Sequence, residues 1–298
     1  KPGLVVIDAQ HRFGVEQRFR LKEKGENPDL LVMTATPIPR TLALTVYGDL
    51  DLSVIDELPP GRSPIITIWK NEEARMEIYR FTREKIAEGR QAYIVAPLIE
   101  PSEEVRAISA LEIFEELTES IFQDLRIGLL HGRVSADEKN QIMEEFRTGK
   151  IDILVSTTVI EVGIDVPNAS IMIIENAERF GLAQLHQLRG RVGRGSHQSY
   201  CFLLGNPTTE EGRQRLTVMT EGSDGFMIAE EDLKIRGPGE FFGTKQSGMP
   251  DLKVANILKD HKLIRLARQE AENIINIDQW QDIYRELYEK INVMELKV

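Results

Sequence analysis

The sequence is poor in cysteine and tryptophan and lacks any long apolar run. Its 298 residues include one cysteine and two tryptophans. A single cysteine excludes an internal disulfide and suits a reducing cytoplasm, and because Cys201 lies in an apolar segment we expect a buried, inert thiol. The absence of a run of about eighteen apolar residues excludes a membrane-spanning helix. The first residues lead straight into a strand-like segment, which is not the pattern of a signal peptide.

Basic residues are outnumbered overall, but their placement is uneven. The net charge of −11 argues against a chain that coats nucleic acid along its whole surface. Residues 72–147 hold 17 acidic and 10 basic side chains, whereas residues 179–215 hold six arginines and two glutamates. An acidic body with one basic patch predicts a protein that grips phosphate at one place.

Strand-like apolar runs alternate with helix-like stretches, which is typical of an α/β fold with a parallel sheet. The expected strands are 4–7, 30–33, 65–69, 92–96, 127–130, 153–156, 170–174 and 200–203. The expected helices are 39–46, 72–88, 107–122, 136–147, 183–191, 209–221 and 226–235, followed by a glycine-rich loop at 236–248 and a helical tail at 254–295. The two helices at 209–235 predict a C-terminal helical hairpin.

A proline-rich break divides the chain. Residues 57–64 hold three prolines and a glycine, which suit a linker because they end helices and central strands. The predicted domains are 1–60, 61–206, 207–250 and 251–298. The first of these has too few strand–helix units to close a core. We therefore expect it to be completed by residues upstream of this sequence.

The most informative dozen residues are 184–195. They contain three arginines, Arg189, Arg191 and Arg194, which are separated by glycines at the end of an expected helix. The guanidinium is a planar fork of donors that matches phosphate oxygens, and glycine lets a ligand come close. Because Arg191 and Arg194 are three residues apart, we expect them to share a helix face and clamp a γ-phosphate.

Three further motifs lie upstream of the arginines. An apolar strand ending at Asp8 places a carboxylate at the carboxyl end of a sheet, where nucleoside-triphosphate hydrolases hold Mg²⁺. Thr34 and Thr36 follow the second apolar run and offer hydroxyls to that acidic motif and to nucleic-acid phosphate. Residues 155–167 end a strand in Ser-Thr-Thr, which suits a phosphate backbone, and then present Asp165 as a partner for a ribose or an arginine.

These four ordered motifs resemble those of superfamily-two nucleic-acid helicases. Within that superfamily the sequence resembles the RecG family of ATP-dependent DNA helicases, which remodel stalled replication forks. The resemblance rests on residues 11–15, 36–43 and 232–248, the last of which resembles the translocation motif of the family, and it spans about 4–275. It implies RecA-like motor domains, ATP and Mg²⁺ as cofactors, branched or forked DNA as the partner, and a cytoplasmic, nucleoid-associated bacterial protein.

The resemblance also implies a role for each matching residue. The implied catalytic residues are Gln187, Arg191 and Arg194, with Arg194 the preferred arginine finger. The implied ATP-binding residues are Asp8, which also holds Mg²⁺, Gly163, Asp165, Arg191 and Arg194. The residues implied in DNA binding or coupling are His11, Thr34, Thr36, Arg133, Thr157, Thr158, Arg236, Glu240 and Gln246.

Two departures from the family pattern limit what this chain does. Position 9 is Ala where the family has a Glu that polarises the attacking water, so we expect impaired ATP hydrolysis unless a change elsewhere compensates. No Gly-x-x-x-x-Gly-Lys-Ser/Thr phosphate loop is present. We expect that loop, and a DNA-binding wedge, in an upstream part of the same protein, and we expect the 298 residues alone to be inactive.

Two other classes of function remain open. The same motor occurs in RNA helicases, although residues 232–248 argue for DNA. Alternatively, Ala9 and the missing phosphate loop fit a non-catalytic binding or regulatory module that has kept the motor fold.

Overall fold

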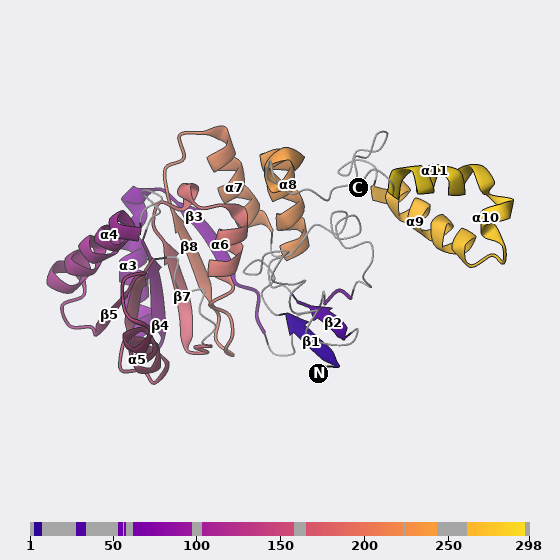
Figure 1. Ribbon diagram of the computed structural model, residues 1–298. Coiled ribbons are helices and arrows are strands. Elements are labelled where there is room, and N and C mark those ends of the chain that lie inside the picture. The colour runs from indigo at the N-terminus through magenta and orange to yellow at the C-terminus, as the bar shows by residue number, and fades with distance from the viewer. Residues whose placement is uncertain are drawn as a thin grey trace. The chain divides into compact units, whose positions relative to one another are not determined.

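A computed structural model describes residues 3–7, 28–33, 53–55, 57, 62–96, 103–157, 165–222, 224–242 and 261–295. These residues fall into two compact units (Figure 1). The first unit contains the described residues from 3 to 235 apart from 53–55, and the second contains 53–55, 236–242 and 261–295. Within the described ranges, no helix combines the length and the apolar character needed to cross a bilayer.

The first unit is built on a six-stranded sheet whose neighbouring strands all pair in parallel (Figure 1). In spatial order the strands are β3 (Ile66–Lys70), β8 (Tyr200–Leu204), β7 (Ala169–Ile174), β4 (Gln91–Val95), β6 (Ile153–Ser156) and β5 (Ile127–Leu130). A separate parallel pair is formed by β1 (Leu4–Ile7) and β2 (Asp29–Val32). The predicted parallel α/β fold is confirmed.

The burial of each strand matches its place in the middle or at the edge of the sheet. Every residue of β4, β6 and β7 is buried, as expected for central strands that are covered on both faces. The edge strands β3 and β5 are only partly buried. The continuous apolar runs therefore lie in the middle of the sheet and the mixed ones at its edges.

Helices cover both faces of this sheet. The helices of the first unit are α3 (Arg75–Ala87), α4 (Glu103–Glu116) with a π-helical continuation at Leu117–Ile121, α5 (Ala136–Arg147), α6 (Leu182–Arg189), α7 (Glu210–Glu221) and the start of α8 (Gly225–Phe242). One core cluster joins α3 and the π-helical turn to one face of the sheet. The other joins α5, α6, α7 and the start of α8 to the opposite face. Consecutive residues of β4 alternate between the two clusters, as the strand period requires.

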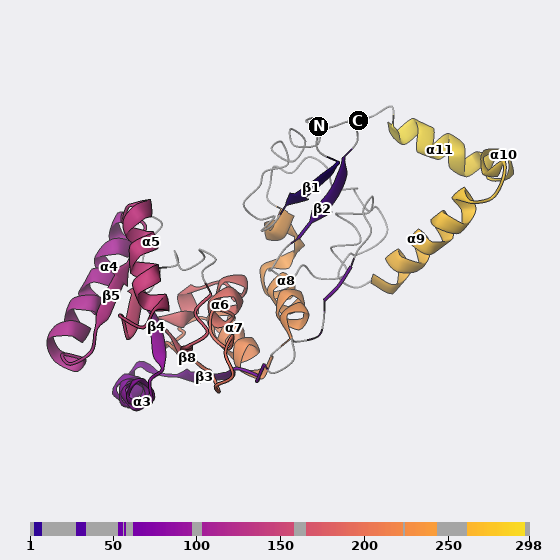
Figure 2. The same cartoon turned by 90° about the horizontal axis from the view of Figure 1, so that it is seen from below.

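The second unit contains the helical tail. Its helices are α9 (His261–Ile275), α10 (Trp280–Ile283) and α11 (Arg285–Glu295). Figure 2 shows α9 and α11 diverging from the short α10. Trp280 meets Tyr288 edge to face, with ring centroids 5.7 Å apart, and so ties α10 to α11. The predicted tail is therefore helical, in three pieces rather than one run.

Two predicted boundaries next to the candidate site are wrong. The helix expected to reach Arg191 ends at Arg189, because Gly190 closes it and Gly193 turns the chain with a φ of +78°. The loop expected from residue 236 begins later, because α8 continues to Phe242. Its glycines and proline lower helix propensity, but extending a helix already nucleated at 225–235 costs less than starting one.

Candidate functional site

The predicted site residues that the structure describes lie at opposite ends of the strands. Asp165 precedes β7 and Arg194 precedes β8, so both lie at the amino-terminal edge of the sheet. Thr157 follows β6 and Arg133 follows β5, so both lie at the carboxyl-terminal edge. We call the first group the arginine edge (Asp165, Arg191 and Arg194) and the second the polar edge (His131, Arg133, Ser156 and Thr157).

The arginine edge is held together by an ion pair. Nη1 of Arg194 lies 3.4 Å from Oδ1 of Asp165, and Nε of Arg194 donates to the carbonyl oxygen of Gly190 at 3.0 Å. The side chains are 25% and 55% exposed, so the pair contributes about 0.2–1 kcal/mol to stability. The pair matters more for geometry than for stability, because it holds the partly buried guanidinium of Arg194 in one direction.

Two glycines of this turn are required by close contacts. A Cβ on Gly193 would lie 2.7 Å from Cγ1 of Ile65, and its left-handed φ also disfavours other residues. A Cβ on Gly195 would collide with the backbone carbonyl of Pro167. The backbone of the arginine turn is thus pressed against residue 167, just after Asp165, which holds Arg194 and Asp165 together.

The charge of the arginine edge extends to the core of the sheet. Burial raises the pKa of the Tyr93 hydroxyl, while the charges of Arg191 and Arg194 act against that rise. Tyr93 belongs to β4 and is 1% exposed. Both arginines therefore place positive charge beside the same buried hydroxyl. The structure brings Arg191 and Arg194 together in a turn after α6, and not on one helix face as predicted.

Arg189 differs from the other two arginines. Its side chain is buried, and Nη1 donates to the carbonyl oxygens of Gly222 at 2.7 Å and Met219 at 3.2 Å. These carbonyls belong to the end of α7 and the residue after it. Arg189, to which the sequence assigned no role at the phosphate, directs these donors into the protein. Gln187, on the same helix, is partly buried.

The polar edge holds neutral groups whose hydrogen-bonding capacity is not used up. Within the described residues, Nδ1 of His131 and Oγ of Ser156 are buried without a hydrogen-bond partner. Burial, together with the charges of Arg133 and Lys139, lowers the pKa of His131, so its imidazole is neutral at pH 7. Thr157 is 4% exposed, and its amide donates to the carbonyl oxygen of Leu130 at 3.1 Å. Arg133, which is exposed at this edge, suits a phosphodiester.

One buried network was missed by the sequence reasoning. Glu175, directly after β7, is 2% exposed and accepts hydrogen bonds from Nη2 of Arg75 and from the hydroxyl of Tyr79, both at 2.8 Å. Burial raises the pKa of this carboxyl, while Arg75 acts in the opposite direction. The network fastens α3 to the end of β7. The sequence signal that could have revealed this network is the acidic residue Glu175 directly after an apolar strand.

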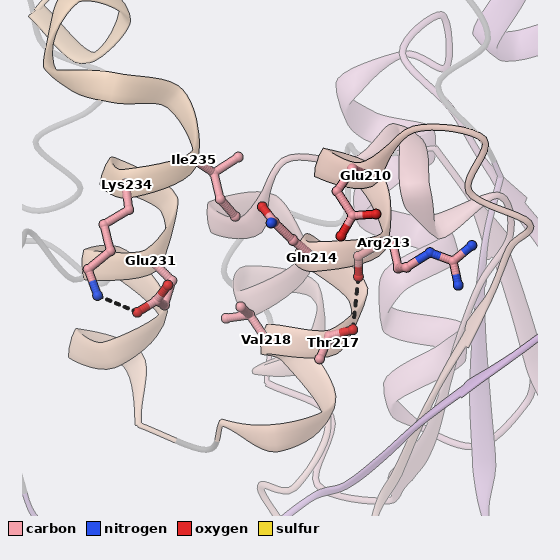
Figure 3. A pocket seen from close by; sticks show the side chains of 8 residues that line it. All are labelled: Glu210, Arg213, Gln214, Thr217, Val218, Glu231, Lys234 and Ile235. Atoms are coloured by element: carbon pink, nitrogen blue, oxygen red, sulfur yellow. Dashed lines mark hydrogen bonds and ion pairs between the residues drawn. The ribbon is translucent and has the colours of Figure 1, made fainter.

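A pocket among the described residues is lined by other side chains than those predicted to bind phosphate. It has a volume of about 490 Å³ and opens between α7 and α8, where Ile235 and Gln214 face each other (Figure 3). Its charged lining is balanced, with the carboxylates of Glu210 and Glu231 against Arg213 and Lys234. Lys234 is paired with Glu231 at 2.6 Å. In the described ranges, no group of three or more acidic, histidine or cysteine side chains could hold a metal ion.

Several predicted site residues lie outside the described residues. These are Asp8, Ala9, His11, Thr34, Thr36, Thr158, Gly163 and Gln246. Arg236 and Glu240 are described as part of helix α8, without their side chains. The described part of the candidate site therefore consists of the arginine edge, the polar edge and the helices that follow them.

Comparisons with known proteins agree with this division of the chain. A model described as "Helicase conserved C-terminal domain" matches residues 72–196, and one described as "ATP-dependent DNA helicase RecG, domain 3, C-terminal" matches residues 222–296. The ATP-dependent DNA helicase RecG of Streptococcus pneumoniae is 54% identical over 280 residues, which is 94% of this chain. That of Thermotoga maritima is 56% identical over 272 residues, or 91% of this chain. The chain belongs to the RecG family.

A solved structure supports the family and the fold. The structure titled "Structure of RecG bound to three-way DNA junction" is 53% identical, has a TM-score of 0.68 and covers 88% of this chain. The helicase MrfA bound to DNA is 19% identical with a TM-score of 0.53, and covers 78% of this chain and 34% of its own, which supports the fold alone.

The match to the RecG family covers only part of each relative. This chain spans 42% of the Streptococcus pneumoniae protein, 35% of the Thermotoga maritima protein and 33% of the chain in the junction complex. The comparisons establish the family and the RecA-like fold. The roles of individual site residues, and the domain boundaries at 60, 206 and 250, stay predictions.

Proposed function

We propose that this chain is the second half of an ATP-driven motor that remodels branched DNA, including stalled replication forks. The observation that carries the proposal is the arginine edge, where Asp165 orients Arg194 and Arg191 precedes it by three residues in the same turn. Two guanidinium forks held in a glycine turn suit the charge that builds on a transferring phosphoryl group. The relatives named above are DNA helicases, and one is bound to a three-way DNA junction.

The roles proposed for the nucleotide site follow from the chemistry of each side chain. Arg191 and Arg194 bind and orient the γ-phosphate of ATP, with Arg194 as the finger, while Gln187 and Asp165 hold the closed interface. Gly163 leaves room for the nucleotide. Asp8 offers a hard carboxylate oxygen, the donor that Mg²⁺ prefers, and would hold that ion. ATP, when bound, supplies the phosphoryl transfer whose charge the arginines stabilise.

The roles proposed for DNA lie at the other edge and beyond it. Arg133 and Thr157 contact phosphate from the polar edge, together with Thr158, His11, Thr34 and Thr36. The hairpin of α7 and α8 passes the motion of the motor to duplex DNA through Arg236, Glu240 and Gln246. We place residues 1–60, 61–206, 207–250 and 251–298 in separate domains, and the protein in the bacterial cytoplasm at the nucleoid.

Ala9 determines whether this motor turns over. A methyl group can neither accept a proton nor orient water, and losing general-base catalysis costs about 10²–10⁴-fold in rate. The test is a chimera in which this chain replaces the matching 280 residues of the Streptococcus pneumoniae relative. We expect slow ATP hydrolysis with Ala9 and a gain of at least about 10²-fold with Ala9→Glu in the presence of forked DNA. Ala267→Glu, the same change at an exposed residue of α9, is the control and should change nothing.

A second candidate function, a non-catalytic binding or regulatory module, is favoured by Ala9. If the chain is a binding module that has kept the motor fold, forked DNA binds but Ala9→Glu brings no turnover. Stimulation by duplex RNA in place of forked DNA would indicate an RNA motor instead. The 298 residues without the added upstream part should show no ATP hydrolysis with either nucleic acid.

A further inference from the structure

Arg189 connects the helix before the arginine edge to the hairpin that follows the motor domain. It is the last residue of α6, and its side chain is 6% exposed. Nη1 donates to the carbonyl oxygens of Met219, in the last turn of α7, and of Gly222, which follows α7. In Figure 1, α6, α7 and the start of α8 lie next to one another.

The position of this cation is costly and specific. Burial lowers the pKa of the Arg189 guanidinium, which expresses the penalty for a charge removed from water. The carbonyls that it meets carry the partial negative charge of a helix C-terminus, which offsets part of that penalty. A neutral apolar side chain of similar length would avoid the penalty altogether. The two directed hydrogen bonds, and not burial, therefore account for an arginine at this position.

The turn that Arg189 meets is tightly built. Gly222 donates its amide to the carbonyl oxygen of Val218 at 2.9 Å, and a Cβ at Gly222 would collide with Cε of Met227. Gly222 therefore fits closely against Val218 and Met227. A displacement of Arg189 must move the turn with it or break the two hydrogen bonds.

Apolar packing joins the same three helices. Leu185 and Leu188 of α6, Met219 of α7 and Ile228 of α8 belong to one buried cluster. Such packing is not directional, so it keeps the helices in contact without setting their orientation. The two hydrogen bonds from Arg189 add that direction. Arg191 and Arg194 follow Arg189 by only two and five residues, so a short turn connects the arginine edge to the residue that holds the hairpin.

We propose that Arg189 is a positioning residue that locks the turn between α7 and α8 to helix α6, so that movement of the arginine edge is transmitted to the hairpin. The proposal rests on the proposed function, because it assigns the route by which that motor would move DNA. Arg189 itself contacts neither nucleotide nor DNA.

The first test measures the lock in the 298-residue chain by hydrogen exchange. Arg189→Met keeps length and apolar character and removes the donors. We expect exchange of the amides at 218–228 to become at least about tenfold faster, while the amides of β4 and β7 are unchanged. Arg189→Lys should restore part of the protection, because an ammonium still donates to one or both carbonyls. Arg126→Met, which removes an exposed pairing with Asp152, is the matched control. Unchanged exchange at 218–228 in Arg189→Met would overturn the proposal.

The second test measures transmission in the chimera that carries Ala9→Glu. With Arg189→Met we expect ATP hydrolysis within about twofold of the parent and DNA branch migration per ATP reduced at least about tenfold. Equal losses in both quantities, or no loss in either, would overturn the proposal. If the parent chimera hydrolyses no ATP, the proposed function fails, whereas the exchange experiment still decides whether Arg189 holds the hairpin turn.

Discussion

The two edges of the sheet are built by opposite means. At the arginine edge, Arg194 is already paired with Asp165, and two glycines fit the turn against its neighbours. At the polar edge, Nδ1 of His131 and Oγ of Ser156 are buried without a partner among the described residues. The first site is oriented before any ligand arrives. The second combines an exposed arginine with buried polar groups that have no such preset pairing among the described residues.

This difference matches the demands of the two proposed ligands. A transferring phosphoryl group gains most from charges that are held in place beforehand, because no reorganisation is then needed at the moment of reaction. A DNA backbone is bound along many residues in turn, so weak, exchangeable contacts suit a protein that moves along it. The predictions that follow test each edge separately, in order of expected effect.

The largest expected effect is at the arginine edge. In the chimera with Ala9→Glu, Arg194→Ala should lower DNA-stimulated ATP hydrolysis by about 10³-fold, because the arginine finger stabilises transition-state charge. Steady-state phosphate release with forked DNA measures the change. Arg126→Ala, at an exposed ion pair, is the control. A loss below tenfold for Arg194→Ala would remove that residue from the nucleotide site.

The close fit of the arginine turn predicts a loss of stability without any ligand. Gly195→Ala forces a methyl group onto the carbonyl of Pro167 and should lower the free energy of unfolding by about 1–3 kcal/mol. At Gly190 a new Cβ meets its nearest atoms at 3.5 Å, so Gly190→Ala should stay within about 0.5 kcal/mol. Urea denaturation of the 298-residue chain measures both. Equal effects of the two substitutions would contradict the proposed fit of the turn.

Helix α6, which leads into the arginine edge, should depend on pH through His186. Burial, with a contribution from Arg189, lowers the pKa of His186 to about 4, while Asp224 acts in the opposite direction. The unfolded state, with a pKa of about 6.5, binds the proton first, so stability is complete above about pH 6.5 and falls as the pH drops toward 4. After allowance for partial exposure, we expect a loss of about 1–2 kcal/mol.

The measurement is urea denaturation at a series of pH values. His186→Asn should remove this part of the acid destabilisation, and His197→Asn, at an exposed position, should not. Parallel pH profiles for His186→Asn and the unaltered chain would show that α6 is less tightly packed than described.

The smallest expected effect is at the polar edge. Arg133→Ala should weaken binding of forked DNA only several-fold and reduce the slope of log K against log salt by about 1, as expected for one lost phosphate contact. Fluorescence anisotropy at several salt concentrations measures both quantities. Arg80→Ala, an exposed arginine of α3, is the control. An unchanged slope would show that Arg133 does not face DNA.

The sheet and most of its helices could be predicted from the sequence, because the central strands are unbroken apolar runs and the helices end at glycines. The spacing of the arginine motif assigned the phosphate to Arg191 and Arg194, but it could not show where the side chain of Arg189 lies. Only tertiary packing decides that Arg189 donates to carbonyls at the end of α7 while Arg194 pairs with Asp165. The lateral order of the strands, β3-β8-β7-β4-β6-β5, could not be predicted either, since it cannot be obtained from the order along the chain.

Hydrogen exchange of the chimera with each ligand in turn tests the separation of the two edges most directly. We predict that a non-hydrolysable ATP analogue protects the amides at 187–195 and leaves 131–133 unchanged. Forked DNA should protect 131–133 and the amide of Thr157 without protecting 187–195 when nucleotide is absent. Protection of the same edge by both ligands would contradict the account.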